Sequence, residues 1–76
     1  MTWTPPADWQ DDLRDALSAA AADRGMSMHA AGVAMGQLCA PTSWTRGDTL
    51  PNVRSLVRYC AALGVRPSDL LREAGL

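Results

Sequence analysis

Arginine is the residue type whose distribution along this chain most favours a chemical role. The stretch from residue 24 to residue 66 carries a charge of +4, against −4 for residues 1–23 and −1 for residues 67–76. Its cations are Arg24, Arg46, Arg54, Arg58 and Arg66. Cationic side chains on one face attract phosphates even in a chain of net charge −1, because phosphates respond to the local potential. The sequence therefore predicts a basic face, and arginines scattered over a solvated surface are the alternative.

Residues for other kinds of chemistry are scarce. The chain has one histidine, His29, and its two cysteines, Cys39 and Cys60, form no CxxC pair. These are too few ligands for a structural zinc site, so we expect no metal and no other cofactor. No phosphate-binding loop or nucleophile motif is present, and we expect that the protein is not an enzyme. A catalytic role would be supported only if His29, Cys39 and Asp48 lay together in one pocket.

The sequence contains no recognisable membrane or export signal. Its longest apolar stretch, residues 17–22, is mostly alanine and includes Ser18, which is unsuited to a membrane span. No signal peptide is apparent, so we expect a cytoplasmic protein in which the cysteines stay reduced.

The composition predicts an all-α domain with a single core. The 76 residues include thirteen alanines and nine leucines against four valines, with no isoleucine or phenylalanine. Such a composition favours helices over strands. Because Pro5 and Pro6 prevent an earlier helix, we expect an extended arm over residues 1–6 and one domain over residues 7–76. Trp3 on the arm is expected to cover the core, and contact with a partner is the alternative.

Apolar spacing and capping residues predict five helices, at about residues 7–24, 27–35, 40–46, 52–63 and 68–74. Ser27 and Asn52 are the expected N-caps. Asp8, Asp11 and Asp12 fall in the first turn of the first helix, where they complement the helix dipole, and a partner-facing acidic patch is the alternative. The inward positions are predicted to be Trp9, Leu13, Ala16, Leu17, Ala20, Met35, Leu38, Trp44, Val53, Leu56, Val57, Cys60, Leu63, Leu70 and Leu71, with Cys39 or Ala40 beside Trp44.

Three blocks of sequence, in this order of helices, resemble the Cro/repressor-type (XRE-like) helix-turn-helix domain. Residues 24–27 (RGMS) resemble the xGLS motif that opens the family's second helix. Residues 44–48 (WTRGD), followed by Pro51, are similar to the [IW]-E-R-G-x-x-x-P signature that closes its recognition helix. Leu56, residues 61–65 (AALGV) and residues 69–71 (DLL) resemble its C-terminal pattern, and residues 25–29 and 46–48 are also similar to BldD-like regulators. The resemblance covers roughly residues 10–73 and implies a five-helix lambda-repressor-like bundle.

The resemblance implies a transcriptional regulator that binds double-stranded DNA with its recognition helix, residues 40–46, in the major groove. The residues that it places at the bases are Gln37, Thr42 and Ser43, with Thr45 on the same polar side of the helix. The residues that it places at the DNA backbone are Arg46, Arg54, Arg58, Ser27 and His29. For Arg46 the alternative is an ion pair with Asp48. For Arg54 and Arg58 the alternative is a solvated helix face, and for His29 it is contact with backbone or solvent. A homodimer on a palindromic site, nucleoid-associated when bound, is also implied.

The sequence departs from the family pattern within the recognition segment. Thr45 stands where the family usually has Glu, Pro41 lies inside the segment, and Met28 replaces the usual Gln. The stretch from Gly36 to Trp44 is also one residue shorter than is common. These changes favour an alternative function on the same fold: a protein-interaction module, such as an anti-repressor, an antitoxin-like protein or an adaptor, that has lost direct DNA reading.

Overall fold

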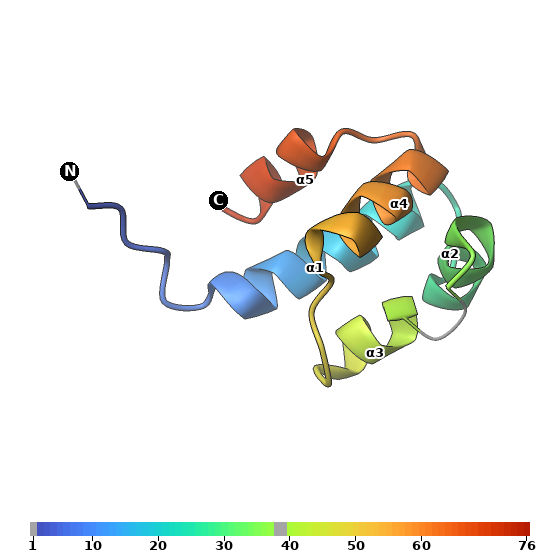
Figure 1. Cartoon of the computed structure of the whole chain (residues 1–76), viewed down its shortest axis with the longest axis horizontal. Helices are drawn as coiled ribbons and strands as arrows, with labels where there is room; N and C mark the ends of the chain where they lie inside the picture. Colours follow the sequence, from blue (N-terminus) through green and yellow to red (C-terminus); the bar gives the residue numbers. More distant parts are fainter. Residues whose placement is uncertain (1, 38–39) are drawn as a thin grey trace.

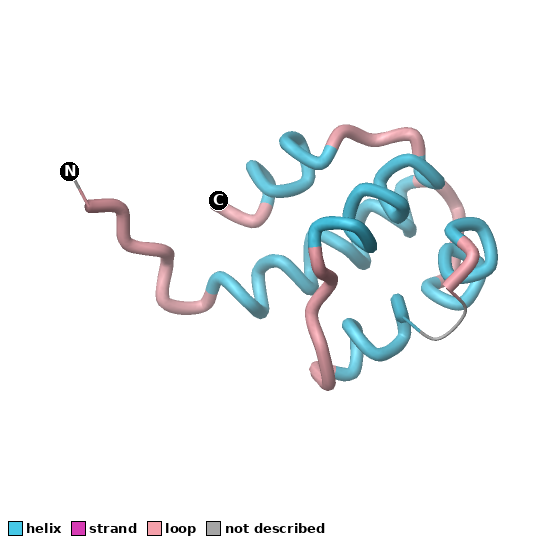
Figure 2. The backbone as a smooth tube through the Cα atoms, in the orientation of Figure 1, coloured by secondary structure: helices cyan, strands magenta, loops and turns pink. Residues whose placement is uncertain are grey.

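The protein is an all-α bundle of five helices. A computed structural model describes residues 2–37 and 40–76. The helices in these ranges are α1 (Trp9–Asp23), α2 (Met28–Met35), α3 (Ala40–Arg46), α4 (Val53–Leu63) and α5 (Pro67–Glu73) (Figure 1). No strand occurs within the same ranges (Figure 2). The predicted fold class, five helices and no sheet, is confirmed.

Helices α2 and α4 begin at the N-cap residues that the sequence predicts, whereas α1 begins at Trp9 and α5 at Pro67 without a side-chain cap. The Ser27 hydroxyl oxygen accepts a hydrogen bond from the amide of Ala30 at 3.0 Å, and the Asn52 side chain accepts one from the amide of Ser55 at 2.8 Å. Each cap satisfies one of the amides that the first turn of a helix leaves without a partner. Local side-chain chemistry therefore fixes where α2 and α4 begin.

Helices α1 to α5 all contribute side chains to the core, and Tyr59 of α4 is its largest fully buried side chain. The Tyr59 side chain is fully buried, and its hydroxyl donates a hydrogen bond to the backbone carbonyl of Leu17 in α1. The ring of Trp44 from α3 meets it edge to face, with the ring centroids 5.2 Å apart. The other buried apolar side chains are Leu13, Ala16, Leu17, Ala21, Ala31, Met35, Cys60, Leu63, Leu70 and Ala74. The predicted inward face of α1 and the predicted burial of Met35, Trp44 and Cys60 are confirmed, whereas Leu38 and Cys39 lie outside the described residues.

The predicted inward face of α4 is wrong at two positions. Val53 is 77% exposed and Val57 is 50% exposed. Tyr59, which the sequence analysis did not place, is buried instead, together with Cys60 and Leu63. A helix buries one stripe of side chains, and the large ring of Tyr59 turns that stripe away from Val57.

The prediction that Trp3 covers the core is also wrong. Residues 2–6 form an extended arm before α1 (Figure 1), and Trp3 is 67% exposed although it lines an apolar hollow with Trp9 and Leu71. Pro5 and Pro6 favour this extended backbone. The arm joins α1 through one backbone hydrogen bond, from the amide of Trp9 to the carbonyl of Pro6.

No helix in the described ranges is both long and apolar enough to cross a membrane. The longest, α1, has 15 residues and carries four aspartates and one arginine.

Candidate nucleic-acid interface

Helix α3 has one buried side and one polar side. Pro41 and Trp44 are buried, and α3 packs against α2 and α1. Thr42 and Ser43 are half-buried, whereas the last residues of the helix, Thr45 and Arg46, are exposed. The short α3 therefore presents small polar side chains and one arginine while its opposite side is fixed in the core.

The end of α3 is held by an arginine that sequence analysis did not single out. Arg14 of α1 donates a hydrogen bond to the carbonyl of Gly47, over an N···O distance of 3.5 Å. It also pairs with Asp11 at 3.1 Å, and its side chain is 19% exposed. Gly47 has a φ of +85°, the left-handed conformation that ends helices and suits glycine. Arg14 and Gly47 are 33 positions apart, so no local pattern could have shown that they meet.

Two of the predicted polar DNA contacts, Gln37 and Thr45, are partly engaged within the molecule. The hydroxyl of Ser55 in α4 donates a hydrogen bond to the side-chain oxygen of Gln37 at 3.1 Å. The hydroxyl of Thr45 donates to the carbonyl of Pro41 at 3.1 Å. An amide oxygen and a hydroxyl oxygen each have two acceptor positions, and the amide nitrogen of Gln37 has two donors. Gln37 and Thr45 therefore keep some capacity for a ligand while their orientation is fixed.

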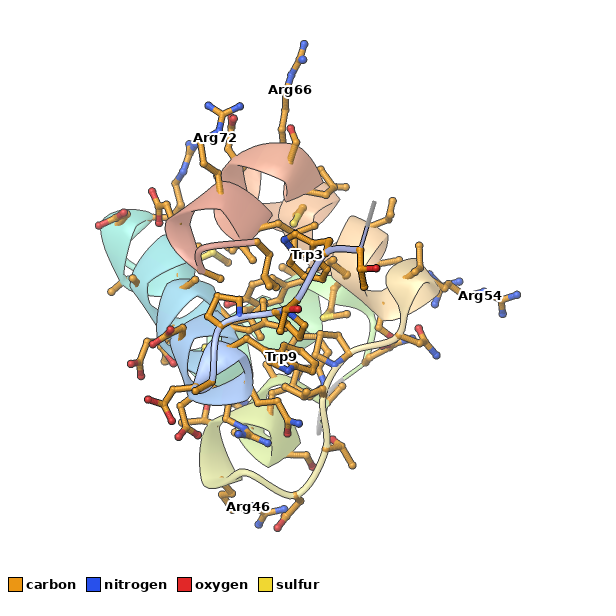
Figure 3. All side chains as sticks on the ribbon, turned by 90° about the vertical axis from the view of Figure 1, so that its left-hand side faces the viewer. Trp3, Trp9, Arg46, Arg54, Arg66 and Arg72 are labelled. Carbon is orange, nitrogen blue, oxygen red and sulfur yellow. The ribbon has the colours of Figure 1, made fainter. Side chains whose placement is uncertain are left out.

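The predicted cations of the interface lie on α3 and α4 but do not converge on one point. Arg46 forms an ion pair with Asp48 at 3.1 Å, as the alternative interpretation expected, and both side chains are more than half exposed. Arg54 and Arg58 are exposed on α4. Neither makes an ion pair within the described residues. In Figure 3 the side chain of Arg46 points downward and that of Arg54 points to the right.

The remaining arginines of the basic stretch serve other surfaces. Arg24 donates a hydrogen bond to the carbonyl of Gly64 at 3.3 Å and so stabilises the end of α4. Arg66 points upward in Figure 3, away from Arg46. The single basic face predicted from the charge distribution is therefore not formed, because the side chains of Arg46, Arg54 and Arg66 point in three different directions.

The start of α2 supplies the last two predicted contacts. The Ser27 hydroxyl is the N-cap of α2, so its oxygen already accepts a hydrogen bond from a backbone amide. His29 lies in the first turn of α2 and is exposed. Ser27 thus has a structural role of its own, while the imidazole of His29 remains accessible to solvent or to a ligand.

Titratable and metal-binding groups do not assemble into a reactive centre in the part of the chain that the structure describes. No three His, Cys, Asp or Glu side chains there come together to hold a metal, and Cys39 lies outside it. Burial raises the pKa of Tyr59 to about 12, with a smaller contribution from Cys60, and burial also raises the pKa of Cys60. A buried thiol that resists ionisation is a poor nucleophile.

Comparison with known proteins gives no match. Neither a model of a protein family, nor a curated protein, nor a solved structure matches this chain. The function has to be inferred from the side chains of α2, α3 and α4.

Proposed function

We propose that this protein binds double-stranded DNA and regulates transcription, with α3 in the major groove. The observation that carries this proposal is the construction of α3. Pro41 and Trp44 fix one side of the helix in the core, and the other side presents Thr45 and Arg46 beside two half-buried hydroxyl residues. Small polar side chains let a helix approach base edges closely, and a groove-reading helix must be held rigidly from behind.

The exposed arginines provide contacts to the DNA backbone in this proposal. Arg54 and Arg58 lie four residues apart on α4, and both are exposed. The pair between Arg46 and Asp48 does not prevent Arg46 from binding a phosphate, because exposed ion pairs contribute only about 0–1 kcal/mol. Phosphate contacts set the register of the protein on DNA, while Thr42, Ser43 and Gln37 face the bases. Ser27 and His29, at the start of α2, would contact the same DNA backbone. The protein would act at the nucleoid in the cytoplasm.

Selection from random duplexes, followed by fluorescence anisotropy over a salt series, tests this proposal. We expect the logarithm of the association constant to fall linearly with the logarithm of the salt concentration. Arg46→Ala and Arg54→Ala should each reduce that slope by about 1, which is the effect of one lost phosphate contact. Arg66→Ala is the matched control, since it removes the same charge from a side chain that points away from Arg46. Failure to bind any duplex at low salt would overturn the proposal, as would an equal effect of Arg66→Ala.

A protein-interaction module is the second candidate, and the state of the recognition segment favours it. Thr45 and Gln37 are both hydrogen-bonded within the molecule, and Asp48 neutralises Arg46. An α3 engaged in this way could instead present its surface to a protein. The same salt series separates the two candidates, because the protein-interaction module predicts no duplex binding even at low salt.

A further inference from the structure

The hydroxyl of Tyr59 in α4 faces one acceptor atom on α1 and another on α2. It donates a hydrogen bond to the backbone carbonyl of Leu17, and the sulfur of Met28 lies 3.4 Å from the same hydroxyl oxygen, also within hydrogen-bond distance. A phenol has one hydrogen to donate, and neither a carbonyl nor a thioether can donate one in return. The two acceptors therefore compete for a single hydrogen, and the carbonyl has the advantage because a thioether is a weak acceptor.

Met28 differs from the other methionines of the described ranges. Met35 is 8% exposed and belongs to the buried core, whereas Met26 and Met28 are half-buried and pack against that core from its edge. The sulfur of Met26 makes no hydrogen bond among the residues that the structure describes. Within these ranges, Met28 therefore combines two properties that Met26 and Met35 do not share: partial exposure to solvent and contact with the phenol of the core.

We propose that Met28 is a site of reversible oxidation by hydrogen peroxide, and that the state of its sulfur decides which helix the Tyr59 hydroxyl is bonded to. A lone pair of the sulfur attacks one peroxide oxygen, an S–O bond forms, and the O–O bond breaks. The departing hydroxide takes the proton from the oxygen on the sulfur and leaves as water. The sulfur is thus oxidised by two electrons to the sulfoxide, and the peroxide is reduced by the same two. Methionine sulfoxide reductases reverse the change.

The sulfoxide reverses the competition for the phenol hydrogen. Its oxygen carries a partial negative charge, accepts hydrogen bonds far better than a thioether does, and is bonded to an atom 3.4 Å from the Tyr59 hydroxyl. The Tyr59 bond consequently moves from Leu17 in α1 to Met28 in α2. Oxidation also turns a flexible apolar side chain into a polar one at the edge of the core. Both changes weaken the packing that holds α1, α2 and α4 together.

Met28 is the first residue of α2 and lies between Ser27, the N-cap, and His29. A shift at the start of α2 on oxidation would reach the contacts that these two neighbours are proposed to make with the DNA backbone. This consequence rests on the proposed function. The oxidation site itself rests on the contact between Met28 and Tyr59 and stands without DNA binding.

Peroxide treatment of the whole protein without DNA, followed by peptide mass spectrometry and thermal denaturation, tests the site. We expect Met28 to gain an oxygen atom before Met35 does, and Tm to fall by about 4–8 °C, the shift that the loss of one hydrogen bond produces in a domain of this size. Met28→Leu should lose most of this fall. Met26→Leu is the matched control, since it removes a half-buried methionine that does not contact Tyr59, and it should show the fall in full. Equal falls in the two variants, or oxidation of Met35 before Met28, would overturn the proposal.

Carbon-13 NMR of the Tyr59 ring tests the exchange of hydrogen-bond partners. Tyr59 is the single tyrosine of the chain, so a label at Cζ, the carbon that bears the hydroxyl, gives one resonance. We expect peroxide to move this resonance in the original protein and in Met26→Leu, and methionine sulfoxide reductases to restore it. A resonance that stays in place when Met28 is oxidised would overturn the exchange. Neither measurement uses DNA, so a protein that binds no duplex would contradict the proposed function and leave both of these results unaffected.

Discussion

Helices α3 and α4 both carry proposed DNA contacts and end alike, but they are held in place differently. Each is followed by a glycine in the left-handed conformation, and the carbonyl of that glycine accepts a hydrogen bond from an arginine: from Arg14 of α1 for α3, and from Arg24, directly after α1, for α4. Helix α4 has 11 residues, an N-cap at Asn52 and three buried side chains. Helix α3 has seven residues, of which Pro41 and Trp44 are buried.

The difference in how α3 and α4 are held shows what stabilises a short helix with a polar outer side. Isolated helices shorter than about 12–15 residues are marginal in water, so neither helix is stable without its neighbours. Helix α4 obtains stability from its own buried stripe. Helix α3 presents small polar side chains outward, so it depends on the few groups that hold it, namely Pro41 and Trp44 on its inner side and Arg14 at its end.

The largest expected effect comes from removing the single large anchor of α3. Trp44→Ala should lower the free energy of unfolding by about 3–5 kcal/mol, the range for truncation of a buried aromatic side chain. Trp44 is 3% exposed and packs edge to face on Tyr59. Urea denaturation followed by circular dichroism measures the change.

Trp3→Ala is the control for Trp44→Ala, because it removes the same side chain from an exposed site. It should change the free energy of unfolding by no more than about 0.5 kcal/mol. Equal losses in the two variants would contradict the packing described for α3.

Alkaline pH should weaken the packing around α4 that supports Trp44. Burial raises the pKa of Tyr59 to about 12, against 10.0 for an unperturbed tyrosine. The folded protein therefore keeps the phenolic proton where the unfolded chain has lost it. The contribution of the protonated Tyr59 to the free energy of unfolding is fully present below pH 10. As the pH rises to about 12, this contribution is lost, and the loss is at most about 2–3 kcal/mol.

Denaturation at several alkaline pH values measures this loss, and the chain offers a clean spectroscopic check. Tyr59 is its single tyrosine, so tyrosinate absorbance reports on this side chain alone. Tyr59→Phe should lower the free energy of unfolding by about 1 kcal/mol at neutral pH, because the hydrogen bond to Leu17 is lost. The free energy of unfolding of this variant should depend less on pH between 10 and 12 than that of the original protein. A titration midpoint near 10 in the folded protein would show that the phenol is not buried.

The sequence was sufficient to predict the elements with local signals. The caps at Ser27 and Asn52 and the stops at Gly36 and Gly64 involve residues within one helical turn of each other. These caps can be predicted from residues that are close in sequence, because capping depends on a side chain and a backbone amide two or three positions away. The five helices follow from these signals and from the scarcity of strand-forming residues.

The sequence was not sufficient where the outcome depends on tertiary packing. The hydroxyl of Tyr59 meets a carbonyl 42 positions earlier in the chain, and this contact sets which face of α4 is buried. Val57 was consequently assigned to the wrong face. At the candidate site, the polar residues of α3 were sufficient to predict its outer side. The internal hydrogen bonds of Gln37 and Thr45 could not be predicted, because they depend on the tertiary structure.

Arg14 of α1 and Arg24, directly after it, give the most direct comparison of the two helix ends. Arg14→Ala should lower the free energy of unfolding by about 1–2 kcal/mol, because its mostly buried side chain packs against the end of α3 as well as donating a hydrogen bond. Arg24→Ala removes the matching bond to Gly64 from an exposed side chain and should cost about 0.5 kcal/mol or less. Urea denaturation at neutral pH measures both changes in the free energy of unfolding.

The two variants should also differ in where the structure loosens. Amide hydrogen exchange in Arg14→Ala should accelerate at residues 45–48, where the amides of Gly47 and Asp48 bond back to Trp44 and Ser43. Exchange in Arg24→Ala should change little around Gly64, because Asn52, Tyr59 and Leu63 still hold α4. Equal losses of stability and protection would mean that α3 is no more dependent on its neighbours than α4. In that case the polar outer side of α3 would need a different source of rigidity.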